Sequence, residues 1–271
     1  MIESNNWAAV APELLLLAMT SLIALFDLAV KTPLRGATYR LTLLTLAVVA
    51  ALHFVQAGAG ETIYAFNDMI VVDTMSSLLK GFATIAVMVT LVYSRPYAGS
   101  RDMLRGGELF TLSLFALLGM FVMISGHHFL TLYLGLELLT LPSYALVALR
   151  RDELRSTEAA MKYFVLGSLA SGFLLYGLSL VYGATGSLDL AEVQQAISSG
   201  MLDKTVLMLG LVFVVAGLAF KLGAVPFHMW VPDVYHGAPT AITLMIGGAP
   251  KLAAFAIVMR LLVEGMLPLV W

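Results

Sequence analysis

The sequence predicts an all-α, polytopic membrane protein with about eight transmembrane helices, of which the seventh is discontinuous. Of its 271 residues, 60% are hydrophobic and only 12% are charged, whereas a soluble domain carries about 25% charged residues. Apolar runs of about 20 residues, the length that crosses a bilayer, recur along the whole chain. Gly223, Pro226 and Pro232 interrupt the seventh run. Lipid is therefore expected to be the solvent for most of the surface.

The composition also excludes several classes of function. A net charge of −2 argues against nucleic-acid binding. The absence of cysteine excludes disulfides and cysteine-ligated iron–sulfur or haem sites within this sequence. No phosphate-binding loop or dinucleotide fingerprint is found. The first apolar run begins near Trp7 without a basic segment before it, so a cleaved signal peptide is not predicted.

Hydropathy predicts eight spans along the sequence. Their expected limits are 9–30, 41–58, 74–94, 108–126, 128–149, 162–183, 205–235 and 240–262. The link between the fourth and fifth spans is very short, which predicts two antiparallel neighbours. The longest loop, 184–204, is expected to carry a short amphipathic helix. The seventh segment is too long for one straight crossing, and its glycine and prolines predict a break just after Lys221.

Basic residues predict the orientation of these spans, because they collect on the cytoplasmic side of a membrane. The loops after the first, third and fifth spans hold ten of the fifteen lysines and arginines: Lys31, Arg35, Arg40, Arg95, Arg101, Arg105, Arg150, Arg151, Arg155 and Lys162. The opposite loops are mainly acidic. Both ends of the sequence are therefore predicted to lie outside.

Three ionisable residues are expected far from any span end, namely Glu137, Lys221 and Lys251. Glu137 is roughly 13 Å deep at 1.5 Å per residue, and the two lysines reach a similar depth. A charge at this depth costs roughly 2.5–3.5 kcal/mol on insertion scales. A glutamate–lysine pair whose separation changes can switch the lysine between holding and releasing a proton. The alternative is a static ion pair that fixes helix packing.

Other polar residues are weaker candidates for proton transfer. His228 lies in the expected break and titrates near neutrality, although a structural role suits it equally well. Lys162 follows Glu158 by four residues, which predicts an ordinary helix salt bridge or a proton entry. His236 lies nearer the basic loop, where a structural or entrance role is expected.

Further charged residues are expected to be peripheral. Lys80 is expected to extend outward to the interface, and Glu13 and Asp27 are expected to be interfacial. His127 and His128 lie in an exterior turn, and two histidines without a third ligand are a weak metal signal.

The motif KLGAVPFHMWVPDVYHGAPTAITLMIGGAPK, residues 221–251, resembles the signature of the antiporter-like proton-translocating subunits of respiratory complex I, the NADH–quinone oxidoreductase. LYLGLELLTLPSYALVAL and STEAAMKYFVLGSLASGFLLYG resemble the same family. The resemblance extends over nearly the whole chain and is strongest from about residue 108 onward.

The resemblance implies a division of the chain and a set of roles. Residues 1–107 correspond to three leading helices, and 108–271 to the first five-helix repeat of the antiporter-like fold, with the second repeat absent. Glu137, Lys221 and Lys251 fall on the residues of the first half-channel and polar axis, and Lys162 on the sixth-helix lysine. The resemblance implies that other complex I membrane subunits and lipid are the partners and that the chain lies in the cell inner membrane. It also implies that NADH, FMN, iron–sulfur clusters and quinone bind to partner subunits. No cofactor is expected on this chain.

Alternative functions remain open from the sequence. A cation–proton antiporter or a hydrogenase-linked membrane subunit shares the same fold and the same Glu–Lys pairs. A truncated chain that lacks the second repeat is also compatible with a scaffold that does not transport.

Overall fold

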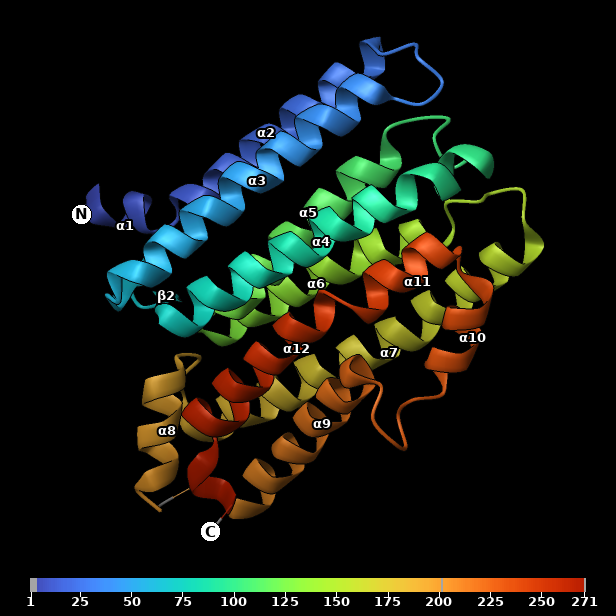
Figure 1. Cartoon of the computed structure of the whole chain (residues 1–271). Helices are drawn as coiled ribbons and strands as arrows, with labels where there is room; N and C mark the ends of the chain where they lie inside the picture. The colour runs from blue at the N-terminus through green and yellow to red at the C-terminus, as the bar shows by residue number, and fades with distance from the viewer. Residues whose placement is uncertain (1–3, 201, 271) are drawn as a thin grey trace.

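The computed structural model describes residues 4–200 and 202–270, which form a bundle of long helices running roughly side by side (Figure 1). The helices of the first half are α1 (Ser4–Ala9), α2 (Ala11–Ala29), α3 (Gly36–Ala59), α4 (Thr74–Ser100), α5 (Glu108–Ser125) and α6 (Phe129–Val147). Those of the second half are α7 (Leu154–Thr185), α8 (Leu190–Ser198), α9 (Lys204–Leu222), α10 (Trp230–Gly237), α11 (Thr240–Gly247) and α12 (Pro250–Val258). A π-helical turn, Met259–Gly265, and a 3-10 turn, Leu267–Val270, follow α12.

The predicted number of crossings is confirmed, because eight helical segments of the described residues are long and apolar enough to span a bilayer. They are α2, α3, α4, α5, α6, α7, α9 and the segment Thr240–Gly265. The break in the seventh span is also confirmed, since α9 ends at Leu222 and α10 begins at Trp230. The eighth span differs from the prediction of one continuous helix. It is interrupted between Gly247 and Pro250, directly before Lys251.

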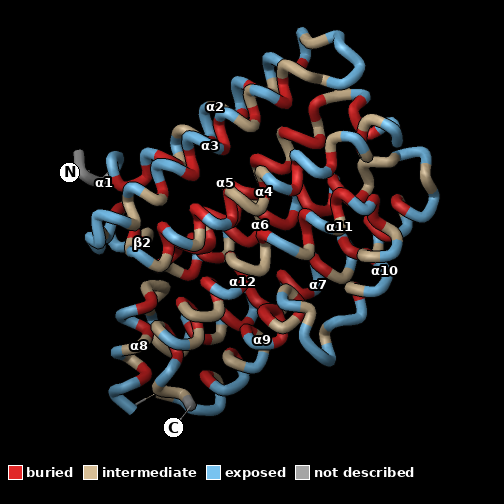
Figure 2. Tube along the Cα trace, in the orientation of Figure 1, coloured by how far each residue is buried: buried red, intermediate tan, exposed pale blue. Residues whose placement is uncertain are grey.

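Helix α5 lies at the centre of the bundle because it is apolar on every side, which is the pattern of a fully buried helix. Figure 2 shows α5 and its neighbour α6 largely buried. Two glycines bring these helices together: a Cβ at Gly119 would lie 2.6 Å from the Leu138 carbonyl carbon, and one at Gly135 would lie 2.5 Å from the Met123 amide. Small residues permit such close backbone approach between membrane helices. The antiparallel packing predicted for the fourth and fifth spans is thus observed.

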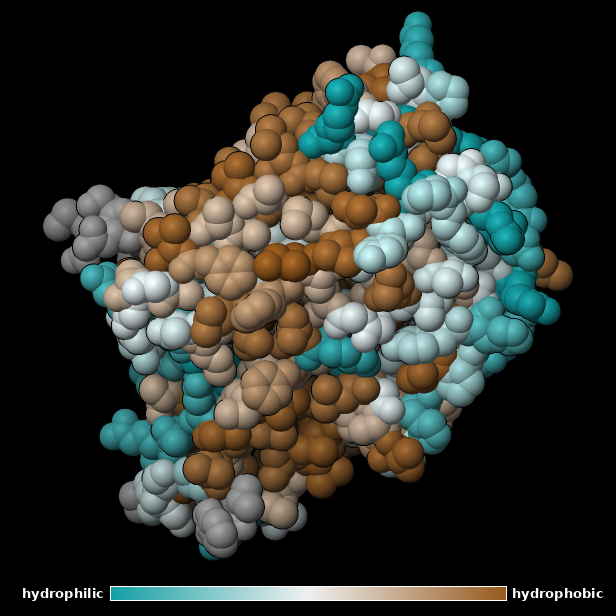
Figure 3. All heavy atoms as spheres, viewed as in Figure 1, coloured by the Kyte–Doolittle hydropathy of each residue, from teal (hydrophilic) through white to brown (hydrophobic). Residues whose placement is uncertain are grey.

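Hydrophobic side chains cover the flank of the bundle, and hydrophilic ones gather toward its two ends (Figure 3). Leu28, Val55, Tyr93 and Leu134 are examples of large apolar residues that are exposed on the helices. An exposed apolar surface of this extent is rare on soluble monomers. It is the surface expected of a protein that is embedded in lipid.

A short β-hairpin corrects the purely helical prediction. β1 (Ile63–Ala65) and β2 (Ile70–Val72) pair antiparallel in the loop between α3 and α4. The turn contains Asn67 and Asp68 in the left-handed conformation, which these residue types tolerate. The Met69 carbonyl accepts a hydrogen bond of 3.0 Å from the His127 amide, so the hairpin covers the α5–α6 turn.

The amphipathic helix predicted in the 184–204 loop is present as α8. Asp189 caps its N-terminus by accepting hydrogen bonds from the Ala191 and Glu192 amides. Leu190, Val193 and Ile197 are its buried residues. Their helical spacing explains why the helix lies across this end of the bundle instead of crossing the membrane.

We expect Gly135→Ala to destabilise the protein by about 1–3 kcal/mol, because the new methyl group meets the rigid backbone of α5. Thermal unfolding in lipid nanodiscs measures the change. Gly172→Ala in α7 is the matched control, since nothing lies within 4 Å of the added Cβ. Its melting temperature should be unchanged or higher, because alanine favours a helix by about 1 kcal/mol over glycine. Equal stability of the two variants would contradict the close contact of α5 with α6.

Candidate functional site

The C-terminal end of α9 is the centre of the candidate site. A helix leaves its last four carbonyl groups without intrahelical donors, and here every one of the four has another donor. The Ala224 amide donates to the Ala219 carbonyl at 2.8 Å, and the Gly223 amide donates to that of Phe220 at 3.0 Å. Gly223 adopts φ 73°, the left-handed conformation that ends helices.

Two side chains complete this helix end. The Trp230 indole donates to the Phe220 carbonyl at 2.8 Å. The Lys251 ammonium group donates to the carbonyls of Lys221 and Leu222, at 3.2 and 3.0 Å. Residues from α10 and α12 therefore satisfy a helix end that the bilayer cannot hydrate.

Two features of this arrangement offset part of the cost of burying a cation at Lys251. The C-terminal end of α9 carries about half a negative charge from the helix dipole. The Trp230 ring centroid lies 5.6 Å from Lys251 Nζ, within the range of a cation–π interaction. The break before Pro250 directs α12 so that Lys251 faces α9 at this point.

Lys221 lies between two small cavities, each of about 10 Å³. One is enclosed by residues of α6, α7 and α9, including Leu136, Gly167 and Ser171. The other is lined by Ser143, Tyr163, Trp230 and both lysines. A water molecule needs a volume of this order together with polar partners. The second cavity supplies those partners, so a single water could link Lys221 with Lys251 there.

Glu137 faces the same region from α6 without a strong partner. Its Oε2 atom is 3.4 Å from the Thr140 hydroxyl, and its Oε1 atom is buried with no partner in the described part of the chain. Glu137 and Lys251 are the charged groups whose fields act on Lys221. The predicted set of Glu137, Lys221 and Lys251 is therefore brought into one region. No direct salt bridge joins Glu137 to either lysine among the described residues.

This geometry suits proton transfer better than static pairing. A structural ion pair is held by short, direct hydrogen bonds, whereas Glu137 keeps one carboxylate oxygen uncommitted. Lys251 retains N–H donors for the α9 carbonyls even as a neutral amine. Its capping function is consequently compatible with both protonation states.

Lys162 and His228 occupy different surroundings from these three residues. Lys162 forms the predicted bridge to Glu158 at 2.9 Å, and in addition contacts Asp233 of α10 at 3.4 Å. This second bridge links α7 to the second half of the broken helix and was not predicted. His228 lies exposed in the loop between α9 and α10, and neither of the cavities beside Lys221 is lined by it.

The expectation that Lys80 extends outward is wrong. Its side chain is 1% exposed and forms an ion pair with Glu13, which was expected at the interface. Sequence reasoning also missed Arg260, which is 3% exposed and binds Asp73 and Glu264 at 2.7 and 2.6 Å. Asp27 does lie near the end of α2, where it pairs with Arg35 at 3.0 Å.

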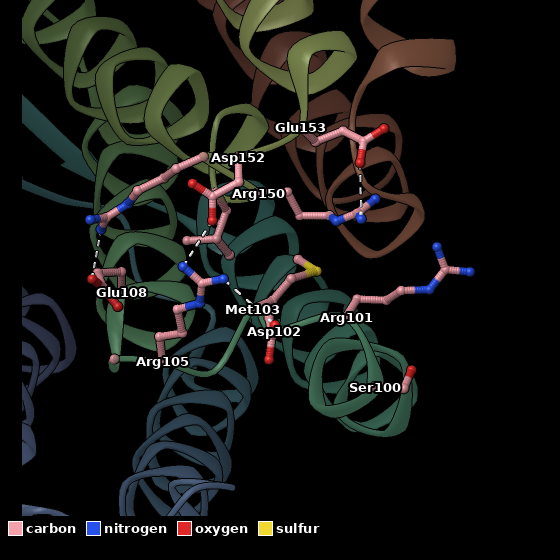
Figure 4. Close-up of a pocket in the computed structure, with 12 residues that line it drawn as sticks. Ser100, Arg101, Asp102, Met103, Arg105, Glu108, Arg150, Asp152 and Glu153 are labelled. Carbon is pink, nitrogen blue, oxygen red and sulfur yellow. Dashed lines mark hydrogen bonds and ion pairs between the residues drawn. The ribbon is translucent and has the colours of Figure 1, made fainter.

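A wider pocket of about 440 Å³ lies at the basic end of the bundle, between the α4–α5 and α6–α7 loops (Figure 4). Arg105 bridges to Asp152 at 2.9 Å, and Arg151 bridges to Glu108 at 2.8 Å. The hydrogen bond that Arg105 donates to the Asp152 carboxylate raises the pKa of the exposed Arg105 guanidinium. Because its charges pair with one another at the surface, this pocket is a salt-bridged connection of loops. Within the described ranges, no cluster of His, Asp and Glu suits a metal ion.

Comparison with known proteins identifies the class to which this fold and site belong. Residues 126–268 match the family model described as "NADH:quinone oxidoreductase/Mrp antiporter, TM". The matched region contains Glu137, Lys221 and Lys251. The chain belongs to this family.

Curated relatives of the chain carry a more specific name. It is 70% identical over 269 residues to NADH-quinone oxidoreductase subunit N of Polaromonas naphthalenivorans, covering 99% of this chain and 54% of the relative. The subunit N of Herminiimonas arsenicoxydans is 61% identical, with 98% of this chain and 54% of the relative covered. The chain thus spans about half the length of the curated relatives that it matches.

Solved structures share the fold. A chain of respiratory complex I from Thermus thermophilus with bound aureothin aligns with a TM-score of 0.76 and 35% identity, covering 92% of this chain and 52% of that one. The Mrp complex from Dietzia sp. aligns with a TM-score of 0.72 and 22% identity, covering 94% of this chain and 48% of that one, which shows the fold alone.

We expect Lys251→Leu to loosen the end of α9, because the carbonyls of Lys221 and Leu222 lose their donor. Hydrogen bonds to a charged group contribute about 1.5–3 kcal/mol, so the Gly223 and Ala224 amides should exchange at least about tenfold faster. Hydrogen–deuterium exchange of the lipid-embedded protein measures this rate. Lys204→Leu, an exposed position at the other end of α9, is the control. Unchanged exchange in Lys251→Leu would show that the lysine does not cap the helix.

Proposed function

We propose that this chain is part of a proton-translocating membrane subunit of an NADH–quinone oxidoreductase. The observation that carries the proposal is the incompletely paired carboxylate of Glu137 beside Lys221 and Lys251 at the broken end of α9. The identity of 70% to a protein named NADH-quinone oxidoreductase subunit N supports it. In this proposal the chain acts in an enzyme complex, as a translocase part.

Within the site, the relay runs from Lys221 to Lys251, and the Glu137 carboxylate controls whether Lys221 holds the proton. A buried lysine remains charged only while a negative group compensates for its desolvation. When Glu137 is ionised and near, Lys221 holds a proton. When that compensation weakens, the proton passes through the polar cavity that Lys221 shares with Lys251. The carbonyl end of α9 receives the positive charge there.

Lys162 is proposed as the entry to this relay. It lies eight residues after the start of α7, at the end of the bundle that also holds the basic loops. Its bridges to Glu158 and to Asp233 place a charged network beside α10. His228, in the exposed loop between the two half-helices, is a secondary candidate for proton exchange with this network.

The proposal assigns the redox chemistry to partner subunits. NADH, FMN, iron–sulfur clusters and quinone belong there, and movement of charge near Glu137 couples their reaction to this chain. The expected partners are other antiporter-like and small membrane subunits, together with lipid. The chain is placed in the cell inner membrane, with residues 1–107 as three leading helices, 108–271 as the first repeat, and the N-terminus outside.

The other functions open to the fold lead to different measurements. A cation–proton antiporter would show sodium-dependent proton movement in vesicles. A non-transporting scaffold would leave proton pumping unchanged when Glu137 is substituted. The similarity to the Mrp complex is confined to the fold at 22% identity, so it does not favour the antiporter.

In the full-length subunit within the assembled complex, we expect Glu137→Gln to reduce proton pumping and quinone reductase activity together, by about tenfold or more. Glutamine keeps the shape and the Thr140 contact but removes the charge that acts on Lys221. Fluorescent-dye quenching in vesicles and NADH oxidation measure the two activities. Glu61→Gln, an exposed residue before the hairpin, is the control and should leave both unchanged. Full pumping in an assembled Glu137→Gln complex would overturn the proposal.

A further inference from the structure

A second group of buried titratable residues lies in α2, α3 and α4, apart from the site described above. Glu13 of α2 and Lys80 of α4 form an ion pair whose side chains are 13% and 1% exposed. His53 of α3 is 0% exposed and lies close enough for both charges to act on it. None of these three residues falls in the family-matched region 126–268.

Several polar atoms of this group lack a hydrogen bond of good geometry, although the Gln56 side chain lies close enough to act on His53. Both ring nitrogens of His53, the Glu13 Oε2 atom and the Gln56 Oε1 atom are buried with no partner in the described part of the chain. Gln56 uses its amide nitrogen to donate to the Ala9 carbonyl at 3.0 Å. A buried polar atom without a hydrogen bond costs about 1–3 kcal/mol. Four such atoms in one region indicate a site that binds water, since water supplies the missing donors and acceptors.

Aromatic side chains from neighbouring helices pack against this cluster. Phe121 of α5 packs edge-on against the His53 ring, with centroids 4.6 Å apart. Gly81 permits close contact with α3, since a Cβ there would lie 2.9 Å from the Phe54 ring. The titratable groups that face the site are Glu13 from α2, His53 from α3 and Lys80 from α4. A hydrophobic replacement would pack here without the desolvation cost of a buried ion pair.

The cluster lies toward the end of the bundle that carries the hairpin. Lys80 is six residues, or about 9 Å, after the start of α4. His53 is six residues before the end of α3, and Glu13 lies in the first turn of α2. Figure 1 places these three helix ends together, opposite the basic loops.

We propose that Glu13, His53 and Lys80 form a second, water-containing proton-transfer site in the three leading helices. Lys80 and Glu13 hold one proton between them, and a bound water connects this pair to a His53 nitrogen that can accept it. Transfer of the proton from Lys80 through water to His53 leaves the net charge of the cluster unchanged. The proposal rests on the proposed function, because it adds a proton path to a chain that moves protons.

Two variants of the full-length subunit in the assembled complex test this site. His53→Gln keeps hydrogen bonding to water but cannot accept a proton near neutral pH. Glu13→Gln with Lys80→Met removes both charges together and so leaves no uncompensated ion. We expect each to lower the protons pumped per NADH oxidised by about twofold or more. Glu108→Gln with Arg151→Gln neutralises an exposed ion pair in the same way and should leave the ratio unchanged.

The Glu137→Gln variant in the same assay separates the two proposals. If it loses pumping while both cluster variants retain the normal ratio, the second site is overturned and the proposed function stands. If all variants pump normally, the proposed function itself fails.

The unmodified protein gives a readout that does not depend on assembly of the variants. Hydroxyl-radical labelling with X-rays modifies buried side chains beside bound water. His53 should be labelled although it is 0% exposed, whereas Phe110, at 1% exposure, should not. Absence of label at His53 would overturn the water-containing site.

Discussion

The backbone of a membrane helix must satisfy its own polar groups, and this requirement explains the structure around the break in the seventh span. No water in the bilayer core can hydrate the four carbonyls at the end of α9. Backbone amides donate hydrogen bonds to two of these carbonyls, and the Lys251 side chain donates to the other two. A charged residue from a distant helix is thus part of the local structure of α9.

The eighth span is also broken, directly before Lys251. The interruption between Gly247 and Pro250 starts a new helix immediately before the lysine. Proline suits that first position because its missing N–H would have no intrahelical partner. Two broken helices therefore meet, and Lys251 of the eighth span stabilises the break in the seventh.

Much of this arrangement is encoded locally and can be predicted from the sequence. The spans follow from hydropathy, and the depth of Glu137, Lys221 and Lys251 follows from counting residues at a fixed rise. The second break had a local signal as well, in the glycines and proline of GGAP, but its position inside an apolar run favoured one continuous helix. The hairpin had only three residues in each strand, too few for the alternation that identifies a strand.

What the sequence could not reveal depends on partners that are remote along the chain. Lys80 pairs with Glu13, 67 residues away, and Arg260 pairs with Asp73, 187 residues away. The general rule that a lysine near a helix end extends to the interface was overridden by these contacts. Helix packing decides which rule applies, and a single sequence does not show that packing.

The charged groups inside the bundle differ in how strongly they are paired. Arg260 contacts two carboxylates directly, so removal of its charge would leave two acids uncompensated. Such a group fixes the junction of α4 with the π-helical turn. Glu137 instead retains an uncommitted oxygen, and His53 retains two uncommitted nitrogens. A group in strong direct ion pairs resists a change of protonation, whereas a group without such a pair is freer to change it. Under the proposed function, the strength of direct pairing, more than burial alone, distinguishes residues that fix helix packing from candidates for proton transfer.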